Sequence, residues 1–193
     1  ALTYHPPAGR DDVEPAPLDL HDLARQALKV YSGQAAEVLP QLLRAGGSPG
    51  GARPKVLVGF DRASGLVISG EADLPDNLEH WIVKFASTTD GDDSGPVEYA
   101  YSLMARAAGL QLPQTRIFET SAKERFFGAR RFDRAEGNRR RHLHTFGNLI
   151  HADFRVPGCD YADLLRATAI LTRDHQDVLR AFRLMAFDSP HPG

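Results

Sequence analysis

The sequence feature that most constrains the fold is a glycine-rich stretch that leads directly into a short apolar strand. Four glycines lie between positions 46 and 51, and the apolar run 56–60 follows closely. Glycine lets the backbone take positive φ and lets a ligand approach closely, and successive N–H groups can line an anion-binding concavity. Arg53 and Lys55 add cationic donors suited to phosphate. A flexible surface linker has the same composition, and the Gly-Lys-Ser/Thr ending of a Walker loop is missing, so both interpretations stay open.

A lysine inside a later strand favours the anion-binding interpretation. The run Trp81-Ile-Val-Lys-Phe85 is strongly apolar apart from Lys84, and a buried ammonium is costly without a partner. Protein kinases place a glycine-rich loop over the nucleotide phosphates and a lysine on the third strand. The order of segments here therefore predicts a phosphate-binding Lys84. The alternative is an edge-strand lysine that points into water.

Hydropathy patterning predicts an α+β protein in which an antiparallel sheet is flanked by helices. Apolar residues make up 42% of the chain, which is enough for a core, and the formal charge of −2 argues against general nucleic-acid affinity. The single cysteine, Cys159, excludes an internal disulfide framework. We expect helices over 20–31, 35–44, 97–108, 160–171 and 176–187, and five strands over 55–60, 65–69, 81–86, 115–119 and 125–132.

Five ordered motifs resemble the HipA family, bacterial serine/threonine kinase toxins of type II toxin–antitoxin systems. They are Gly47-Ser-Pro-Gly-Gly-Ala-Arg-Pro-Lys55, Trp81-Ile-Val-Lys-Phe85, Glu98-Tyr-Ala-Tyr101, Ala108-Gly-Leu-Gln-Leu-Pro113 and Arg131-Phe-Asp-Arg134. The resemblance covers most of residues 1–188. It implies a protein-kinase-like N-lobe with a five-stranded antiparallel sheet, followed by the start of a helical C-lobe.

The resemblance also implies an ATP site and phosphoryl transfer to a protein serine. The nucleotide-binding residues it indicates are Gly47, Ser48, Gly50, Gly51, Lys55, Lys84, Arg130 and Phe132, with the backbone of 130–132 holding adenine. Glu98 is the candidate carboxylate partner of Lys84, although a first-turn glutamate is also favoured by the helix dipole alone. Ser48 matches the family's autophosphorylation position, where a phosphate would add negative charge to the triphosphate site; the alternative is a small turn residue.

The resemblance further predicts three regions and a missing catalytic loop. Residues 1–45 form a lead-in with two helices, 46–134 the nucleotide-binding lobe, and 135–193 a truncated beginning of the helical lobe. The family's catalytic loop and its Mg²⁺ ligands are expected downstream of this chain, so we assign no catalytic or metal-binding residue and expect the piece to be inactive alone.

The expected partners are ATP, a HipB-like antitoxin and a protein substrate such as an aminoacyl-tRNA synthetase, in a cytoplasmic, membrane-free setting linked to bacterial persistence. DNA contact is expected only through the antitoxin. One alternative is a kinase-derived module that has lost its chemistry and binds an antitoxin. Another is an anion-binding α+β domain unrelated to kinases, which would require Lys84 to face solvent.

Overall fold

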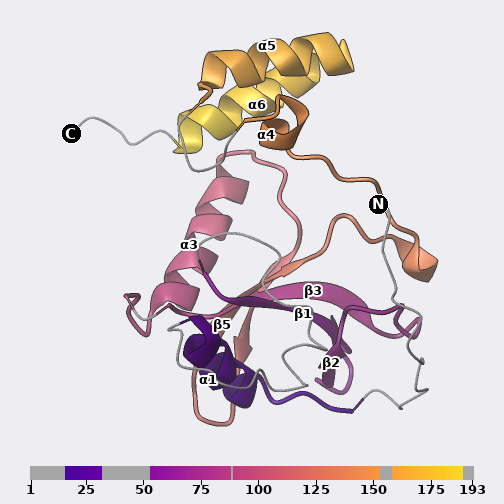
Figure 1. The fold of residues 1–193 in the computed structure, drawn as a ribbon, viewed down its shortest axis with the longest axis vertical. Coiled ribbons are helices and arrows are strands. Elements are labelled where there is room, and N and C mark those ends of the chain that lie inside the picture. Colours follow the sequence, from indigo (N-terminus) through magenta and orange to yellow (C-terminus); the bar gives the residue numbers. More distant parts are fainter. Residues whose placement is uncertain (1–15, 32–52, 88, 153–157, 189–193) are drawn as a thin grey trace. The chain divides into compact units, whose positions relative to one another are not determined.

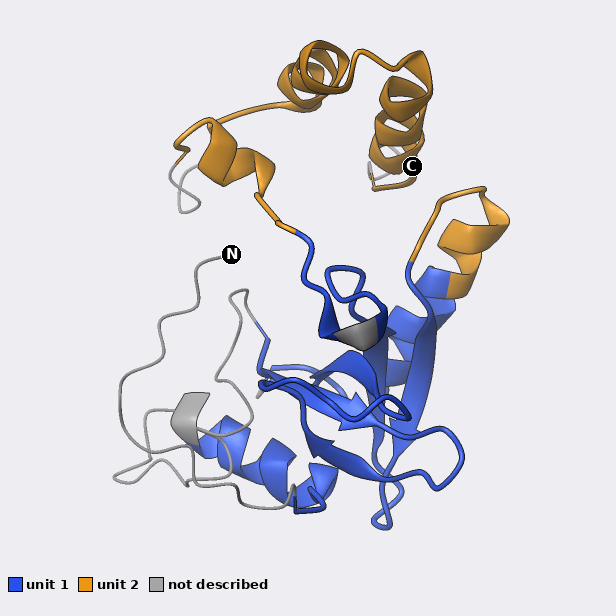
Figure 2. Ribbon diagram, turned by 90° about the vertical axis from the view of Figure 1, so that its right-hand side faces the viewer, with its two compact units in different colours: residues 1–102, 113–141 blue, residues 103–112, 142–193 orange. Residues whose placement is uncertain are grey.

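The computed structural model describes residues 16–31, 53–87, 89–152 and 158–188. The chain divides into two compact units, one formed by residues 1–102 and 113–141 and the other by 103–112 and 142–193 (Figure 2). Within the described ranges there are five α-helices and one five-stranded sheet. The expected helix over 35–44 lies outside the described residues.

The first unit is built on an open antiparallel sheet with the strand order β2-β1-β3-β5-β4 (Figure 1). Its strands are β1 (Lys55–Phe60), β2 (Val67–Ser69), β3 (Glu79–Lys84), β4 (Thr115–Glu119) and β5 (Arg125–Arg130). The prediction of five antiparallel strands is confirmed. β3 begins two residues earlier than expected, with Glu79 and His80, and β5 ends at Arg130, before the turn that contains Asp133.

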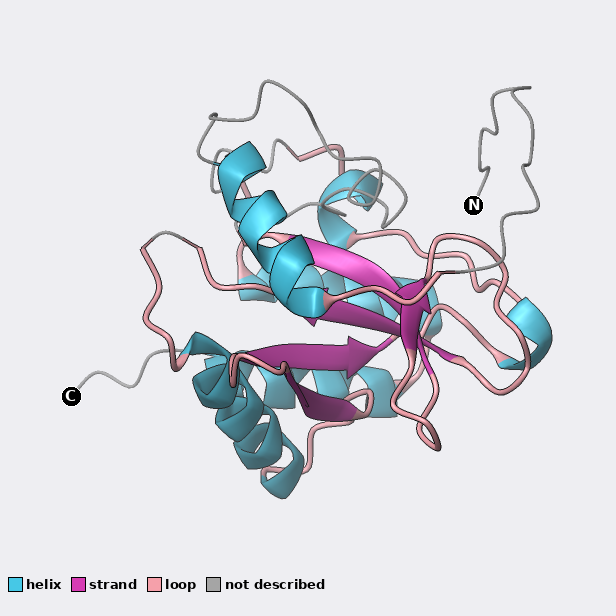
Figure 3. Ribbon diagram, turned by 90° about the horizontal axis from the view of Figure 1, so that it is seen from below, coloured by secondary structure: helices cyan, strands magenta, loops and turns pink. Residues whose placement is uncertain are grey.

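Helix α1 (Leu20–Tyr31) packs on one face of this sheet (Figure 3). Asp19 caps its first turn, because its carboxylate accepts a hydrogen bond from the His21 N–H at 2.8 Å. Leu23 is 1% exposed and belongs to the same core cluster as Trp81 and Phe85. Edge-to-face ring contacts consolidate the core, between Phe60 and Phe118, Trp81 and Phe118, and Phe85 and Phe126.

Helix α3 (Ser94–Ala107) begins beside the sheet, and its first turn approaches β5 closely. A Cβ on Gly95 would lie 2.1 Å from the carbonyl oxygen of Arg125, so only glycine allows this approach. Farther along the same helix, the Ser102 hydroxyl forms a hydrogen bond of 2.9 Å with the Thr115 hydroxyl of β4. The face of the sheet that carries Thr115 is therefore the face next to α3.

The second unit contains the short helix α4 (Phe146–Leu149) and the pair α5 (Tyr161–Thr172) and α6 (His175–Asp188). A capping box between Asp160 and Asp163 starts α5, and Arg173 ends it with a positive φ of 54°. The α5 and α6 helices contact each other, and the Tyr161 hydroxyl donates a hydrogen bond to Asp188.

Candidate functional site

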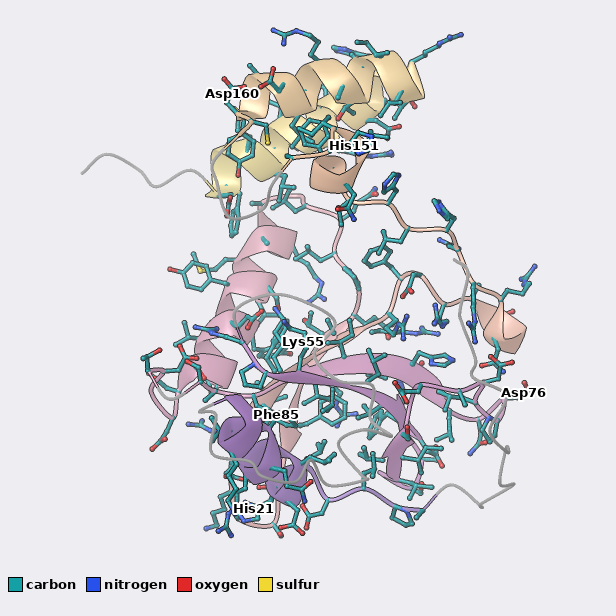
Figure 4. The ribbon with its side chains drawn as sticks, viewed as in Figure 1. His21, Lys55, Asp76, Phe85, His151 and Asp160 are labelled. Carbon is teal, nitrogen blue, oxygen red and sulfur yellow. The ribbon has the colours of Figure 1, made fainter. Side chains whose placement is uncertain are left out.

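The candidate site is built around two lysines that lie directly opposite each other on β1 and β3. The antiparallel register pairs Lys55 with Lys84 and, on the next strand, Lys84 with Phe127. Paired residues in an antiparallel sheet share a face, and the Lys84 ammonium lies 5.2 Å from the centre of the Phe127 ring. Figure 4 shows Lys55 and Phe85 on opposite sides of the sheet, as the alternation of side chains requires.

Glu98 of α3 supplies a carboxylate to this face. Lys84 donates a hydrogen bond to Glu98 Oε1, and the two side chains are 34% and 26% exposed. Lys84 is therefore held by a carboxylate across the strand–helix contact. Its partner is the glutamate indicated by the sequence, and whether the pair binds nucleotide remains a prediction.

Arg53 completes the basic cluster, which we define as Arg53, Lys55 and Lys84. Arg53 Nη2 lies 2.8 Å from Asp90 Oδ1, and Arg53 Nη1 lies 3.6 Å from Glu98 Oε2. Burial lowers the pKa of Lys55, and the charge of Lys84 lowers it further while Glu98 raises it. Three cationic side chains thus surround two carboxylates, an arrangement that favours an added anion.

An apolar row runs beside the basic cluster on the same face. Leu57, Ile82 and Ala129 are paired across β1, β3 and β5, two residues along each strand from the lysine row. Two residues of extended strand separate the rows by about 7 Å. All three residues are partly exposed, whereas Val56 and Val83 on the α1 side are fully buried. Cationic and aliphatic groups side by side suit a ligand with a charged end and an aromatic end.

The residues predicted to hold adenine lie at the other end of the strands. The Arg130 N–H donates to the Gln114 carbonyl at 2.8 Å, so this backbone donor is already used within the sheet unit. Phe132 follows β5 and is 59% exposed. Arg131 next to it donates its own N–H to the His80 carbonyl at 2.8 Å. The structure therefore does not bring Arg130 and Phe132 together with Lys55 and Lys84, and Gly47, Ser48, Gly50 and Gly51 lie outside the described residues.

Two hollows open at opposite ends of β3. The larger, about 820 Å³, is lined by His80, Arg130, Arg131 and Arg134 among others. The smaller, about 430 Å³, lies between α1 and the end of β3: its lining joins Lys84 and Asp90 to Ala24 and Leu28 of α1 and does not include Arg53 or Lys55. Arginines and carboxylates both line the larger one, and Glu79 contacts Arg62 at 2.9 Å and Arg130 at 3.5 Å. We place the candidate site at Lys84 on the face of the sheet next to α3, because the basic cluster and the apolar row lie side by side there.

Asn138 fixes the segment that follows β5. Its side chain accepts hydrogen bonds from the Leu74 N–H at 2.8 Å and from His80 Nε2 at 2.9 Å, and it donates to the Leu74 carbonyl at 2.8 Å. Burial lowers the pKa of His80, and the nearby charges of Arg134 and Arg131 lower it as well. Asn138 was not among the residues predicted from the sequence, because its positive φ of 58° lies in a 3₁₀ turn without periodicity.

The carboxylates beside the basic cluster are engaged by its cations. Across residues 16–31, 53–87, 89–152 and 158–188, no group of three or more histidine, cysteine, aspartate or glutamate side chains is placed to hold a metal ion. Asp90 and Glu98 are engaged with Arg53 and Lys84 instead. In the same ranges, no helix has the length and apolar character needed to cross a membrane.

Comparison with known proteins identifies the family of the chain. No curated protein matches it. The model of the HipA-like C-terminal domain matches residues 47–189, which include all five strands of the sheet and the helices α3 to α6. Because this match extends over most of the sequence, the chain belongs to the HipA-like C-terminal domain family.

Proposed function

We propose that the first unit is the nucleotide-binding lobe of a HipA-like serine/threonine kinase. The observation that carries the proposal is the pairing of Lys55 with Lys84 on one sheet face, with Lys84 held by Glu98. Kinase lobes use the same combination of a strand lysine and a helix glutamate to hold ATP phosphates. The third strand and the following helix supply these groups here as well.

The basic cluster and the apolar row beside it would bind different parts of the nucleotide. The ammonium groups of Lys55 and Lys84, with Arg53, would bind the phosphates as charge-assisted donors. Leu57, Ile82 and Ala129 would contact the base, since an apolar strip takes up an aromatic ring and excludes water from it. The glycine-rich stretch would lie against the phosphates, as the sequence predicts.

The reaction proposed for the family is transfer of the γ-phosphoryl group to a protein hydroxyl. The serine oxygen forms a bond to the γ-phosphorus, the bond from that phosphorus to the bridging oxygen breaks, ADP leaves, and the hydroxyl proton passes to a base. The described residues contribute binding and orientation to this reaction, and no step is assigned to a metal ion. A HipB-like antitoxin and an aminoacyl-tRNA synthetase substrate remain part of the proposal through family resemblance alone.

Calorimetric titration tests the proposal. The unaltered chain, Lys84→Ala and Lys29→Ala are each titrated with ATP, with and without Mg²⁺. Lys29 is an exposed lysine of α1, so its replacement removes the same charge on the opposite face. We expect saturable binding by the unaltered chain and Lys29→Ala and at least about tenfold weaker binding by Lys84→Ala. Failure of the unaltered chain to bind ATP, or equal binding by all three, would overturn the proposal.

A further inference from the structure

We propose that Asp90 is a positioning residue of the phosphate site: it holds Arg53 toward the bound phosphates and keeps it from displacing Lys84 on Glu98. This inference rests on the nucleotide site proposed above. It assigns a role in ligand affinity to an acidic residue, whose negative charge would by itself oppose the binding of a polyphosphate.

The Asp90 carboxylate is fixed in place from two sides. Its Oδ2 accepts hydrogen bonds from both the N–H and the hydroxyl of Ser87, each at 2.8 Å, and its Oδ1 faces Arg53 Nη2 at 2.8 Å. The Asp90 N–H closes the same turn by donating to the Ser87 carbonyl at 3.2 Å. The side chains of Arg53 and Asp90 are 41% and 14% exposed, so the carboxylate is shielded from water while the guanidinium stays open to it.

A backbone hydrogen bond also links the chain next to Arg53 with the chain that leads to Asp90. The Phe85 N–H donates to the Pro54 carbonyl at 2.9 Å, which ties the residue after Arg53 to the end of β3. Ser87 and Asp90 follow that end directly in the chain. Arg53 is therefore held both through the backbone of its neighbour Pro54 and through its guanidinium.

Arg53 lies close to Glu98, the same carboxylate that binds Lys84. Its Oε1 accepts a hydrogen bond from Lys84, and its Oε2 lies 3.6 Å from Arg53 Nη1. A guanidinium can form a bidentate pair with a carboxylate, which an ammonium cannot. If Asp90 released Arg53, the guanidinium could close on Glu98 and compete with Lys84. Both cations would then turn toward Glu98 and away from the phosphates.

The charge state of Asp90 suits this role. The hydrogen bonds from Ser87 hold its pKa below the ordinary aspartate value, and the charge of Arg53 lowers it further. The carboxylate therefore stays ionised at neutral pH. With Glu98 it places two carboxylates beside the three cations of the basic cluster.

The substitution Asp90→Asn separates this role from simple electrostatics, because the two explanations predict opposite signs. Removal of a negative charge near an anion site should tighten phosphate binding if Asp90 acts only through its charge. If Asp90 instead acts by holding Arg53, loss of that contact should weaken phosphate binding. Asp92→Asn is the matched control, since Asp92 is an exposed residue of the same loop. We expect Asp90→Asn to weaken ATP binding by about tenfold, the effect of one charge-assisted hydrogen bond, and Asp92→Asn to leave it unchanged or slightly tighter.

A double-mutant cycle with Arg53→Gln controls for damage to the turn. If Asp90 acts through Arg53, Asp90→Asn should have no weakening effect in the Arg53→Gln background. A purely structural effect on the Ser87–Asp90 turn would persist there. Inorganic tripolyphosphate should show the same loss as ATP, and adenosine should show none, because Arg53 belongs to the basic cluster that would bind the phosphates.

The outcomes separate this inference from the proposed function. Binding of ATP by the unaltered chain together with equal or tighter binding by Asp90→Asn overturns the role of Asp90 alone. A loss that persists in the Arg53→Gln background overturns that role as well. Failure of the unaltered chain to bind either ATP or tripolyphosphate overturns the nucleotide site and the role of Asp90 together.

Discussion

Lys55 and Lys84 are directly paired residues of β1 and β3, so two ammonium groups project from neighbouring strands on the same face of the sheet. Like charges at paired positions repel each other and destabilise a sheet. Glu98 relieves part of this repulsion through its bond with Lys84. The remaining repulsion is a cost that a bound polyphosphate would remove, which is why we regard this pair as the centre of the site.

The lowered pKa of Lys55 predicts a pH dependence of ATP binding. Lys55 binds phosphate only when it is protonated, and its pKa in the folded chain lies below the ordinary lysine value because of burial and Lys84. Affinity should therefore be full below this lowered pKa and fall as the pH rises through it. Lys55→Arg keeps its charge at all these pH values, so its binding curve should stay flat to higher pH. The measurement is the ATP dissociation constant between about pH 7 and pH 10, a range that ends near the ordinary lysine pKa. Equal profiles for both chains would contradict the assignment of Lys55.

Gly95→Ala should destabilise the first unit. The added Cβ would meet the carbonyl oxygen of Arg125 at 2.1 Å, and a backbone atom cannot move aside cheaply. We expect a loss of about 1–3 kcal/mol in the free energy of unfolding, typical of overpacking. Gly147→Ala in α4 is the control, because nothing lies within 4 Å of the added Cβ, and alanine favours a helix. Urea denaturation followed by circular dichroism compares the two; equal stability of Gly95→Ala and the unaltered chain would be inconsistent with the close approach of α3.

Asn138→Ala should also destabilise the first unit, through lost hydrogen bonds. The change leaves the N–H and C=O of Leu74 and the Nε2 of His80 without their partner. Unsatisfied groups that are partly buried cost about 1–3 kcal/mol. Asn77→Ala removes only a weak contact of 3.5 Å to Asp61 and should stay near the unaltered chain. Asn138→Asp retains the acceptor oxygen, so its free energy of unfolding should fall between those of Asn138→Ala and Asn77→Ala. The same urea series measures all three variants.

His80 should make the protein less stable in mild acid. Its pKa in the folded chain is lowered by burial and by Arg134 and Arg131, so the unfolded chain binds a proton at pH values where the folded chain does not. Unfolding then takes up a proton, and the free energy of unfolding falls as the pH decreases from about 6.5 toward the lower folded value. Below that value the effect levels off. Unfolding curves between about pH 5 and pH 8, a range around the unperturbed pKa, should flatten in His80→Gln and keep their slope in His175→Gln, which replaces an exposed histidine.

The five strands and the helices α1, α3, α5 and α6 were accessible from the sequence because each carries a local signal, whereas the pairing of Lys84 with Glu98 was expected from the family resemblance. The apolar run in 55–60 and the apolar stripe of 20–31 reflect burial against the core, and both elements have the predicted bounds. The order β3-β5-β4 and the pairing of Lys55 with Lys84 depend on long-range register, which no local pattern encodes. The contact of Asp90 with Arg53 joins residues in two irregular segments, and so it had no periodicity to predict it.

The position of Trp81 gives the first unit an optical signature of its own. It is the single tryptophan of the chain, it is 1% exposed, and it contacts the Phe60 and Phe118 rings of the sheet unit. Its fluorescence therefore reports on the sheet unit, whereas the far-ultraviolet helical signal comes from both units, since α1 and most of α3 lie in the first unit and α5 and α6 in the second. Superimposable melting curves from the two probes would mean that the chain unfolds as one cooperative system, and separated curves would mean that each unit melts by itself.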